Sequence, residues 1–87
     1  MAYKIAILPS ALRHLANLPR PDQKRVASKI DHLSTDPRPP GAKKLKSDHD
    51  LYRIRIGKYR VIYAVEDVRL TVLVVRVGHR REVYRGV

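Results

Sequence analysis

The chain has 87 residues, which allows one domain (residues 1–87) with a single core and excludes a large internal substrate cleft. Hydrophobic residues make up 44% of the chain and charged residues 31%, a composition that favours a folded domain over a disordered one. Nineteen lysines and arginines against eight acidic residues give a formal charge of +11, so nucleic acid or an acidic protein is the expected partner.

The chain contains no cysteine, which excludes a disulfide framework and a thiolate zinc site. The N-terminal residues do not resemble a signal peptide. The longest apolar stretch, residues 70–77, is interrupted by Thr71 and Arg76 and is far shorter than the ~20 residues of a membrane helix. We therefore expect a cytoplasmic protein that does not bind a membrane.

The N-terminal half predicts a strand followed by a helical hairpin. Residues 3–8 are short and apolar and are ended by Pro9, as expected for a strand at or near a sheet edge. Ser10 is a candidate N-cap for a first helix that Pro19 stops, with apolar positions Ala11, Leu12, Leu15 and Leu18. Pro21 suits the first helical position of a second helix, whose buried stripe is Val26, Ile30 and Leu33.

The segment after these helices predicts a basic loop. Asp36 and the proline and glycine residues of 37–41 are typical of irregular structure. The loop is expected to continue through three lysines, which are either solvated or bound to nucleic acid: Lys43, Lys44 and Lys46.

From Leu51 the hydrophobic period changes to two, which predicts a half-buried strand. Gly57 and Lys58 fit a two-residue hairpin turn, which places Arg55 opposite Arg60. One face of the hairpin then carries Tyr52, Ile54, Ile56, Tyr59, Val61 and Tyr63, and the helices should cover it. We call the opposite sheet surface the arginine face, and it carries Arg53, Arg55 and Arg60.

Residues 70–77 predict the last strand. A three-residue loop at 67–69 would set Arg76 opposite Arg60 on the arginine face and send Leu73, Val75 and Val77 into the core. That register leaves an apolar strip on the arginine face, which the chain end or a partner protein should cover: Ile62, Ala64, Val72 and Val74.

The arginine face has two interpretations. Arginine stems can cover apolar surface while their charged ends stay in water. However, Arg55 and Arg60 repel each other and should weaken the hairpin by some tenths of a kcal/mol. Converging guanidinium groups bind phosphate through their forked donors, so the cluster, with Arg80 nearby, predicts a phosphate site.

A histidine and a tyrosine lie next to this face in the sequence. RNA can be cut without a metal when its 2′-hydroxyl attacks the neighbouring phosphate, which requires a base, charge stabilisation and an acid. His79 and Tyr84 are candidates for proton transfer, and nearby cations should lower the pKa of the Tyr84 phenol from ~10. The alternative is that Tyr84 packs and His79 lies on the surface.

Three segments resemble the RelE toxins of the RelE/ParE superfamily of toxin–antitoxin systems. They are residues 51–55 (LYRIR), residues 57–63 (GKYRVIY) and residues 77–84, with VGHR followed by VY. The likeness spans nearly the whole chain. It implies an α+β fold with an N-terminal strand and two helices packed on a largely antiparallel sheet.

The resemblance also implies an activity. RelE toxins are mRNA endoribonucleases that cut the message in the ribosomal decoding site and inhibit translation, without a metal or cofactor. The implied roles are transition-state stabilisation by Arg55, Arg60 and Arg80, anchoring by Arg53, and proton transfer by Tyr84 with His79 as a competitor. The best-known members have lysines where this chain has Arg53 and Arg55, and arginine stays charged, so neither serves as the general base. Arg76 does not come from the family motif and is expected to give electrostatic support.

Partners follow from the same resemblance. It implies an antitoxin whose acidic and apolar segments cover the charged face, with operator DNA bound only through the complex, and lysines 43, 44 and 46 placed to contact ribosomal RNA. One alternative is a ParE-like toxin that inhibits DNA gyrase through a protein interface, against which the joint presence of Arg60, Arg80 and Tyr84 argues. The other is a non-catalytic nucleic-acid-binding module, which the charge alone permits.

Overall fold

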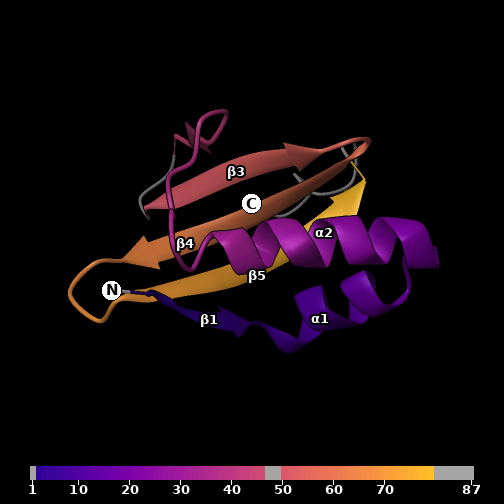
Figure 1. Ribbon diagram of the computed structural model, residues 1–87, viewed down its shortest axis with the longest axis horizontal. Coiled ribbons are helices and arrows are strands. Elements are labelled where there is room, and N and C mark those ends of the chain that lie inside the picture. Colours follow the sequence, from indigo (N-terminus) through magenta and orange to yellow (C-terminus); the bar gives the residue numbers. More distant parts are fainter. Residues whose placement is uncertain (1, 47–49, 80–87) are drawn as a thin grey trace.

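The computed structural model describes residues 2–46 and 50–79 of the chain. In chain order the elements are β1 (Lys4–Ile7), α1 (Pro9–Ala16), α2 (Arg20–His32), β2 (Lys43–Lys44), β3 (Leu51–Ile56), β4 (Tyr59–Glu66) and β5 (Thr71–His79) (Figure 1). Within these residues the strands form a five-stranded sheet in the order β1-β5-β4-β3-β2. Strand β1 is parallel to β5 and the other neighbours are antiparallel, so the α+β prediction and the edge position of β1 are confirmed.

Helix α1 starts at a proline rather than at the predicted cap, and α2 starts between two prolines. Helix α1 begins at Pro9, and Leu8 is its N-cap with no side-chain cap bond, so the prediction that Ser10 caps it is wrong. Proline suits this position because its φ is already helical and the first turn needs no N–H from it. Helix α2 begins at Arg20, one residue before Pro21. No helix in the described part of the chain has the length and apolarity needed to cross a membrane.

The helices form an antiparallel hairpin packed on one face of the sheet (Figure 1). The core between them contains Ala11, Leu15, Val26, Ile30 and Leu33 from the helical segment and Ile54, Ile56, Val61, Tyr63, Val65, Val72, Val74 and Val77 from the strands. The predicted stripe of α2 is therefore confirmed. Leu12 of α1, in contrast, is 52% exposed.

Two tyrosines fasten the proline-rich segment after α2 to the sheet. The Tyr63 hydroxyl donates a hydrogen bond to the backbone oxygen of Pro37 at 2.7 Å, and burial raises the pKa of Tyr63 to about 12. The Tyr52 ring stacks on Tyr63 with centroids 5.9 Å apart, and its hydroxyl accepts a bond from Nε of Arg38 at 2.9 Å. These contacts give the segment a defined path along the end of the sheet.

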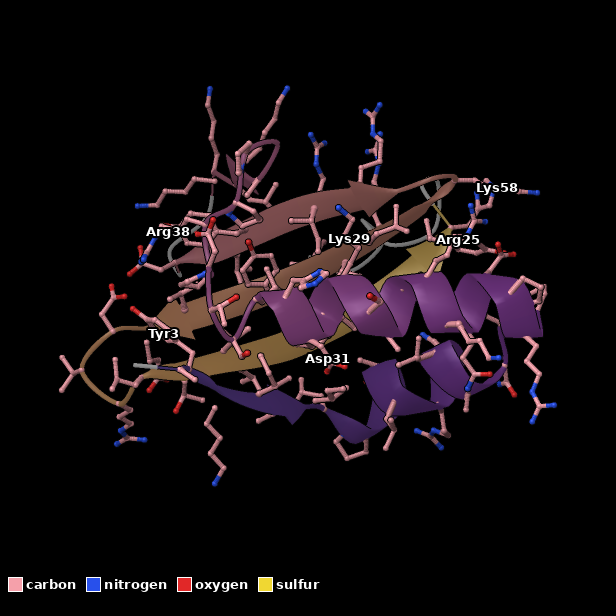
Figure 2. All side chains as sticks on the ribbon, viewed as in Figure 1. Tyr3, Arg25, Lys29, Asp31, Arg38 and Lys58 are labelled. Carbon is pink, nitrogen blue, oxygen red and sulfur yellow. The ribbon has the colours of Figure 1, made fainter. Side chains whose placement is uncertain are left out.

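The same segment is tied to the β4–β5 loop by an ion pair. Arg38 binds Asp67 with both ends of its fork, Nη1 to Oδ1 at 3.1 Å and Nη2 to Oδ2 at 2.9 Å. Tyr3 donates to Oδ1 of Asp67 at 2.7 Å, and Figure 2 shows Tyr3 and Arg38 at the same end of the molecule. The hydrogen bonds from Arg38 and then Tyr3 hold the pKa of Asp67 below its usual value.

Two of the three lysines of the predicted loop lie in a strand, whereas Lys46 lies in irregular structure as expected. Lys43 and Lys44 form the short strand β2, in which Lys43 lies opposite Arg53 and Lys44 opposite Tyr52. The N–H of Leu45 continues the pairing to the carbonyl oxygen of Leu51 at 2.9 Å. The sheet therefore extends one strand beyond the predicted edge.

The β3–β4 hairpin has the predicted register, whereas the β4–β5 register is wrong. The second loop has four residues, 67–70, with Leu70 at φ 48°, so Val72 and Val74 rather than Leu73 and Val75 face the helices. A β-bulge next to Ile62 then shifts the pairing once more and places Arg76 opposite Ile62. Arg76 therefore lies on the arginine face, but not opposite Arg60.

Tyr63→Phe should lower the free energy of unfolding by about 1–2 kcal/mol, because it removes a buried hydrogen bond and leaves the carbonyl of buried Pro37 without that partner. Urea unfolding measures the change. Tyr3→Phe, which removes the exposed hydroxyl at Asp67, is the matched control and should lower stability less. Equal losses in the two variants would contradict the role assigned to Tyr63.

Asp67 should make stability depend on pH. Because its pKa is lowered in the folded state, its contribution is present above the usual aspartate value of ~3.9 and is lost as pH falls through the lower folded value. Asp67→Asn should therefore lower Tm near pH 7, and the gap to wild type should shrink below about pH 4. Thermal unfolding across this range checks it, and a gap that stays constant would rule the effect out.

Candidate nucleic-acid interface

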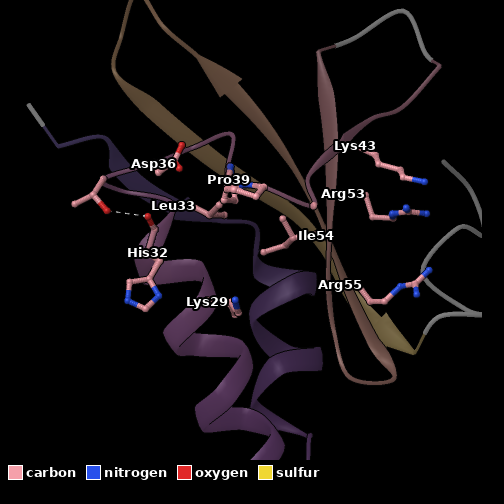
Figure 3. Close-up of a pocket in the computed structure, with 12 residues that line it drawn as sticks. Lys29, His32, Leu33, Asp36, Pro39, Lys43, Arg53, Ile54 and Arg55 are labelled. Carbon is pink, nitrogen blue, oxygen red and sulfur yellow. Dashed lines mark hydrogen bonds between the residues drawn. The ribbon is translucent and has the colours of Figure 1, made fainter.

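Alternation along β3 separates apolar from charged side chains. Figure 3 shows Ile54 pointing toward the helices, while Arg53 and Arg55 point away from them together with Lys43. Ile54 is 6% exposed and belongs to the core, whereas Arg53 is half-buried and Arg55 is exposed. The strand thus carries its arginines on the face that the helices leave open.

Strand pairing brings the cations of the arginine face close together. Arg55 lies directly opposite Arg60 in the hairpin, and Lys43 lies directly opposite Arg53. Ile62 of β4 is paired with Arg53 of β3 on one side and with Arg76 of β5 on the other, so the three side chains form one row across the sheet. Since neighbouring strands are only about 4.8 Å apart, long guanidinium side chains from adjacent strands can reach the same phosphate.

An apolar row forms the floor of this face. Ile62 is fully buried yet is not part of the helix-side core. Beside it, Leu51, Ala64 and Leu73 are paired across three strands, and each is half-buried. The predicted strip is therefore corrected: Ile62 and Ala64 belong to it, whereas Val72 and Val74 lie in the core.

A cleft of about 620 Å³ continues from the arginine face around the edge of β3. Arg53 and Arg55 line it from the strand, and Lys29 and His32 line it from α2 (Figure 3). Asp36 is the single acidic residue among its described lining residues. Positive charge therefore extends from the arginine face toward the end of α2. Sequence reasoning missed Lys29 and His32, because helical periodicity does not show which exposed residues approach a sheet edge.

Histidine 79 is placed apart from the arginine pair. It lies opposite Tyr59 at the end of β5, with the two rings edge to face and their centroids 6.3 Å apart. The residue opposite Arg60 is Gly78, so alternation sends the His79 side chain to the helix side of the sheet. The described geometry does not bring the imidazole beside Arg60.

The remaining predicted residues divide into two groups. Lys44 and Lys46 are exposed, and Lys44 forms an ion pair with Asp50 at 3.2 Å. Arg80 and Tyr84 lie outside the described residues. Across residues 2–46 and 50–79, no group of three or more potential metal ligands comes together.

Comparison with known proteins gives the family. Residues 5–84 match the model of a family described as "ParE toxin of type II toxin-antitoxin system, parDE". The putative toxin RelE1 of Methanocaldococcus jannaschii is 31% identical over 99% of both chains. Toxin RelG of Mycobacterium tuberculosis is also 31% identical, over 98% of this chain and 99% of its own.

Solved structures agree with the sequence relatives. The toxin–antitoxin complex RelBE2 of M. tuberculosis contains a chain with a TM-score of 0.80 and 29% identity, covering 92% of this chain and 100% of that one. The intact RelBE toxin–antitoxin complex of Escherichia coli gives a TM-score of 0.79 and 28% identity, with coverage of 90% and 96%. The chain therefore belongs to the RelE/ParE superfamily and is a RelE-like toxin of a type II toxin–antitoxin system.

Proposed function

We propose that this toxin is a ribosome-dependent mRNA endoribonuclease that inhibits translation and binds RNA on its arginine face. The observation that carries the proposal is the direct pairing of Arg55 with Arg60 on a face that also holds Lys43. Like charges placed opposite each other weaken a sheet. An anionic ligand would bridge the pair, because its phosphate would accept donors from both guanidinium groups.

The chemistry is an attack by the 2′-hydroxyl of the RNA on the adjacent phosphorus. A bond forms between O2′ and phosphorus while the bond from phosphorus to O5′ breaks. A base takes the proton from O2′ and an acid gives one to O5′, so the products are a 2′,3′-cyclic phosphate and a 5′-hydroxyl. Charge builds up on the non-bridging oxygens, and Arg55, Arg60 and Arg80 would donate hydrogen bonds to them. Arg53 would anchor the backbone, and Arg76 would add positive potential.

Proton transfer is assigned to Tyr84, on the match of residues 77–84 to the family pattern. The group that takes the proton from O2′ must be unprotonated. Arginine stays protonated at neutral pH, so it does not serve as this base. A phenol near several cations favours its phenolate form. His79 is the competitor for this role, and its position against Tyr59 on the helix side makes it the weaker candidate.

A cognate antitoxin would control the activity by covering the arginine face. That face combines basic side chains with the half-buried apolar row of Leu51, Ala64 and Leu73, so it is complementary to a segment with both acidic and apolar residues. The solved complexes of similar toxins with antitoxins support this partner. Operator DNA would be bound through the complex, and the exposed lysines 43, 44 and 46 would contact ribosomal RNA.

The description of the matching family favours one alternative, a ParE-like toxin that inhibits DNA gyrase through a protein interface. The relatives named RelE and the Arg55–Arg60 pair favour RNA cleavage instead. A binding module without catalysis would hold RNA on the same face and leave it intact. Assays of cleavage and of gyrase supercoiling separate the three.

Arg60→Ala and Arg80→Ala should each reduce cleavage about 10²- to 10³-fold, the loss expected when one donor to a developing oxyanion is removed. Primer extension on ribosome-bound message measures the cut. Arg69→Ala removes the same charge from the exposed β4–β5 loop and should keep cleavage near wild type. Unimpaired cleavage in both site variants would overturn the assignment, and gyrase inhibition without cleavage would select the alternative.

Tyr84→Phe should remove most cleavage while leaving binding to ribosomes intact, because it deletes the proton-transfer hydroxyl and no charge. The same primer-extension assay, together with ribosome cosedimentation, tests both effects. Tyr3→Phe is the matched control, since its hydroxyl bonds Asp67 in the β4–β5 loop. Full activity in Tyr84→Phe would move the proton-transfer role to another group.

A further inference from the structure

A second pocket, of about 240 Å³, lies where α1 and β5 end at the same end of the molecule (Figure 1). His14 and Asn17 line it from the end of α1, residues 76–79 line it from β5, and Tyr59 lines it from β4. Its volume is below the roughly 300–1,000 Å³ of sites for drug-sized ligands. The pocket therefore fits one small group better than a folded segment.

Strand β5 turns a free edge toward this end of α1. Strand β1 pairs with β5 only from Thr71 to Val74, and the N–H of Leu8 makes the last backbone bond, to the Val74 oxygen at 2.9 Å. Within the described residues no strand pairs with that side of 75–79. An edge of this kind presents backbone N–H and C=O groups as donors and acceptors. A ligand in the pocket can form hydrogen bonds with the backbone of β5.

Ring contacts fix the shape of the pocket wall. The Tyr59 hydroxyl donates to Oδ2 of Asp22 at 3.0 Å, and Asp22 is also paired with Arg25. The ring of Tyr59 meets that of His79 at an interplanar angle of 84°. Asn17 adds an amide with both donor and acceptor atoms. Flat aromatic surface beside such groups is the combination that recognises unpaired bases in RNA.

The pocket is continuous with the arginine face through β5. Arg76 and Gly78 both line it, and both occupy arginine-face positions of the strand. Gly78 lies opposite Arg60, and because glycine has no side chain, β5 places no obstacle beside Arg60 at that position. An RNA strand on the arginine face can therefore pass over Gly78 and turn a base into the pocket.

We propose that this pocket binds the nucleobase of a nucleotide next to the scissile phosphate. The inference rests on the proposed RNA cleavage and deepens it, because a base contact at this end of the sheet would make cleavage depend on the sequence of the message. Arg76 is the one formally charged side chain among the described lining residues, and the other walls include the amide of Asn17 and the ring of Tyr59.

Binding is tested without cleavage by titrating ¹⁵N-labelled protein with the four nucleoside 5′-monophosphates and with ribose 5-phosphate. The side-chain amide of Asn17 and the backbone amide of Gly78 should shift with at least one nucleotide and much less with the sugar phosphate. Equal shifts with ribose 5-phosphate, which has no base, would show that the pocket binds only the phosphate and would overturn the assignment. Shifts confined to β3 would overturn it as well.

Variants test the effect on cleavage. Asn17→Ala and His14→Ala should change the relative use of cleavage sites by about tenfold, the size expected for one base contact. Arg13→Ala, the adjacent α1 residue outside the pocket lining, removes a full charge and should leave the site pattern unchanged. The same change in Arg13→Ala, or an unchanged pattern in both pocket variants, would refute the base contact.

The two proposals fail separately. If the wild-type protein cleaves no message, the proposed function is wrong, and the nucleotide titration still decides whether the pocket holds a base. If cleavage occurs with an unchanged pattern in the variants and no nucleotide-specific shifts, the pocket inference is wrong and the function stands. Thermal unfolding of each variant shows that any change arises in a folded protein.

Discussion

The strict alternation of side chains along the β3–β4 hairpin is the constraint on which the other features depend. Each strand has one face that must be apolar to meet the helices, so the charged residues between them are forced together on the other face. The turn at Gly57, with φ 59°, sets the pairing that places Arg55 opposite Arg60. A one-residue change in that turn would put the arginines of one of the two strands on the core face.

The helix side of the molecule supplies the stability that the arginine face lacks. Like charges placed opposite each other disfavour a hairpin, while the buried residues of the helical segment and of β3, β4 and β5 stabilise it from the opposite side. At one end, Tyr63 and Arg38 hold the proline-rich segment and the β4–β5 loop against the sheet. At the other end, Tyr59 ties β4 to Asp22 of α2. These contacts lie at the two ends of the sheet, and the cations of the central strands lie between them.

Features set by local sequence were predictable, and features set by packing were not. The β3–β4 register follows from one short turn, and the α2 stripe follows from helical periodicity. The β4–β5 register depends on a loop with Leu70 in a left-handed conformation and on a bulge, neither of which leaves a clear pattern in the sequence. The loop and the bulge each shift the pairing by one residue in the same direction, and a total shift of two residues keeps Arg76 on the arginine face.

The candidate site shows the same division. Arg53, Arg55 and Arg60 share a face because they alternate with apolar residues, and the sequence was sufficient to predict that. Lys43 entered the arginine face through β2, a strand of two residues that the lysine-rich composition concealed. The placement of His79 depended on the bulge in β5. The sequence therefore predicted the β3–β4 pairing at one short turn better than the pairing of β2 and β5 with these strands.

The location of the scissile phosphate decides whether RNA is bound and cut on the arginine face. A structure of the protein on a ribosome whose message carries a 2′-O-methyl group at the cut, so that O2′ cannot attack, would trap the uncut RNA. The phosphate should lie over Arg55 and Arg60, on the side of the sheet away from α1 and α2. A phosphate positioned against the helices, with the arginine face in contact with no RNA, would contradict this prediction.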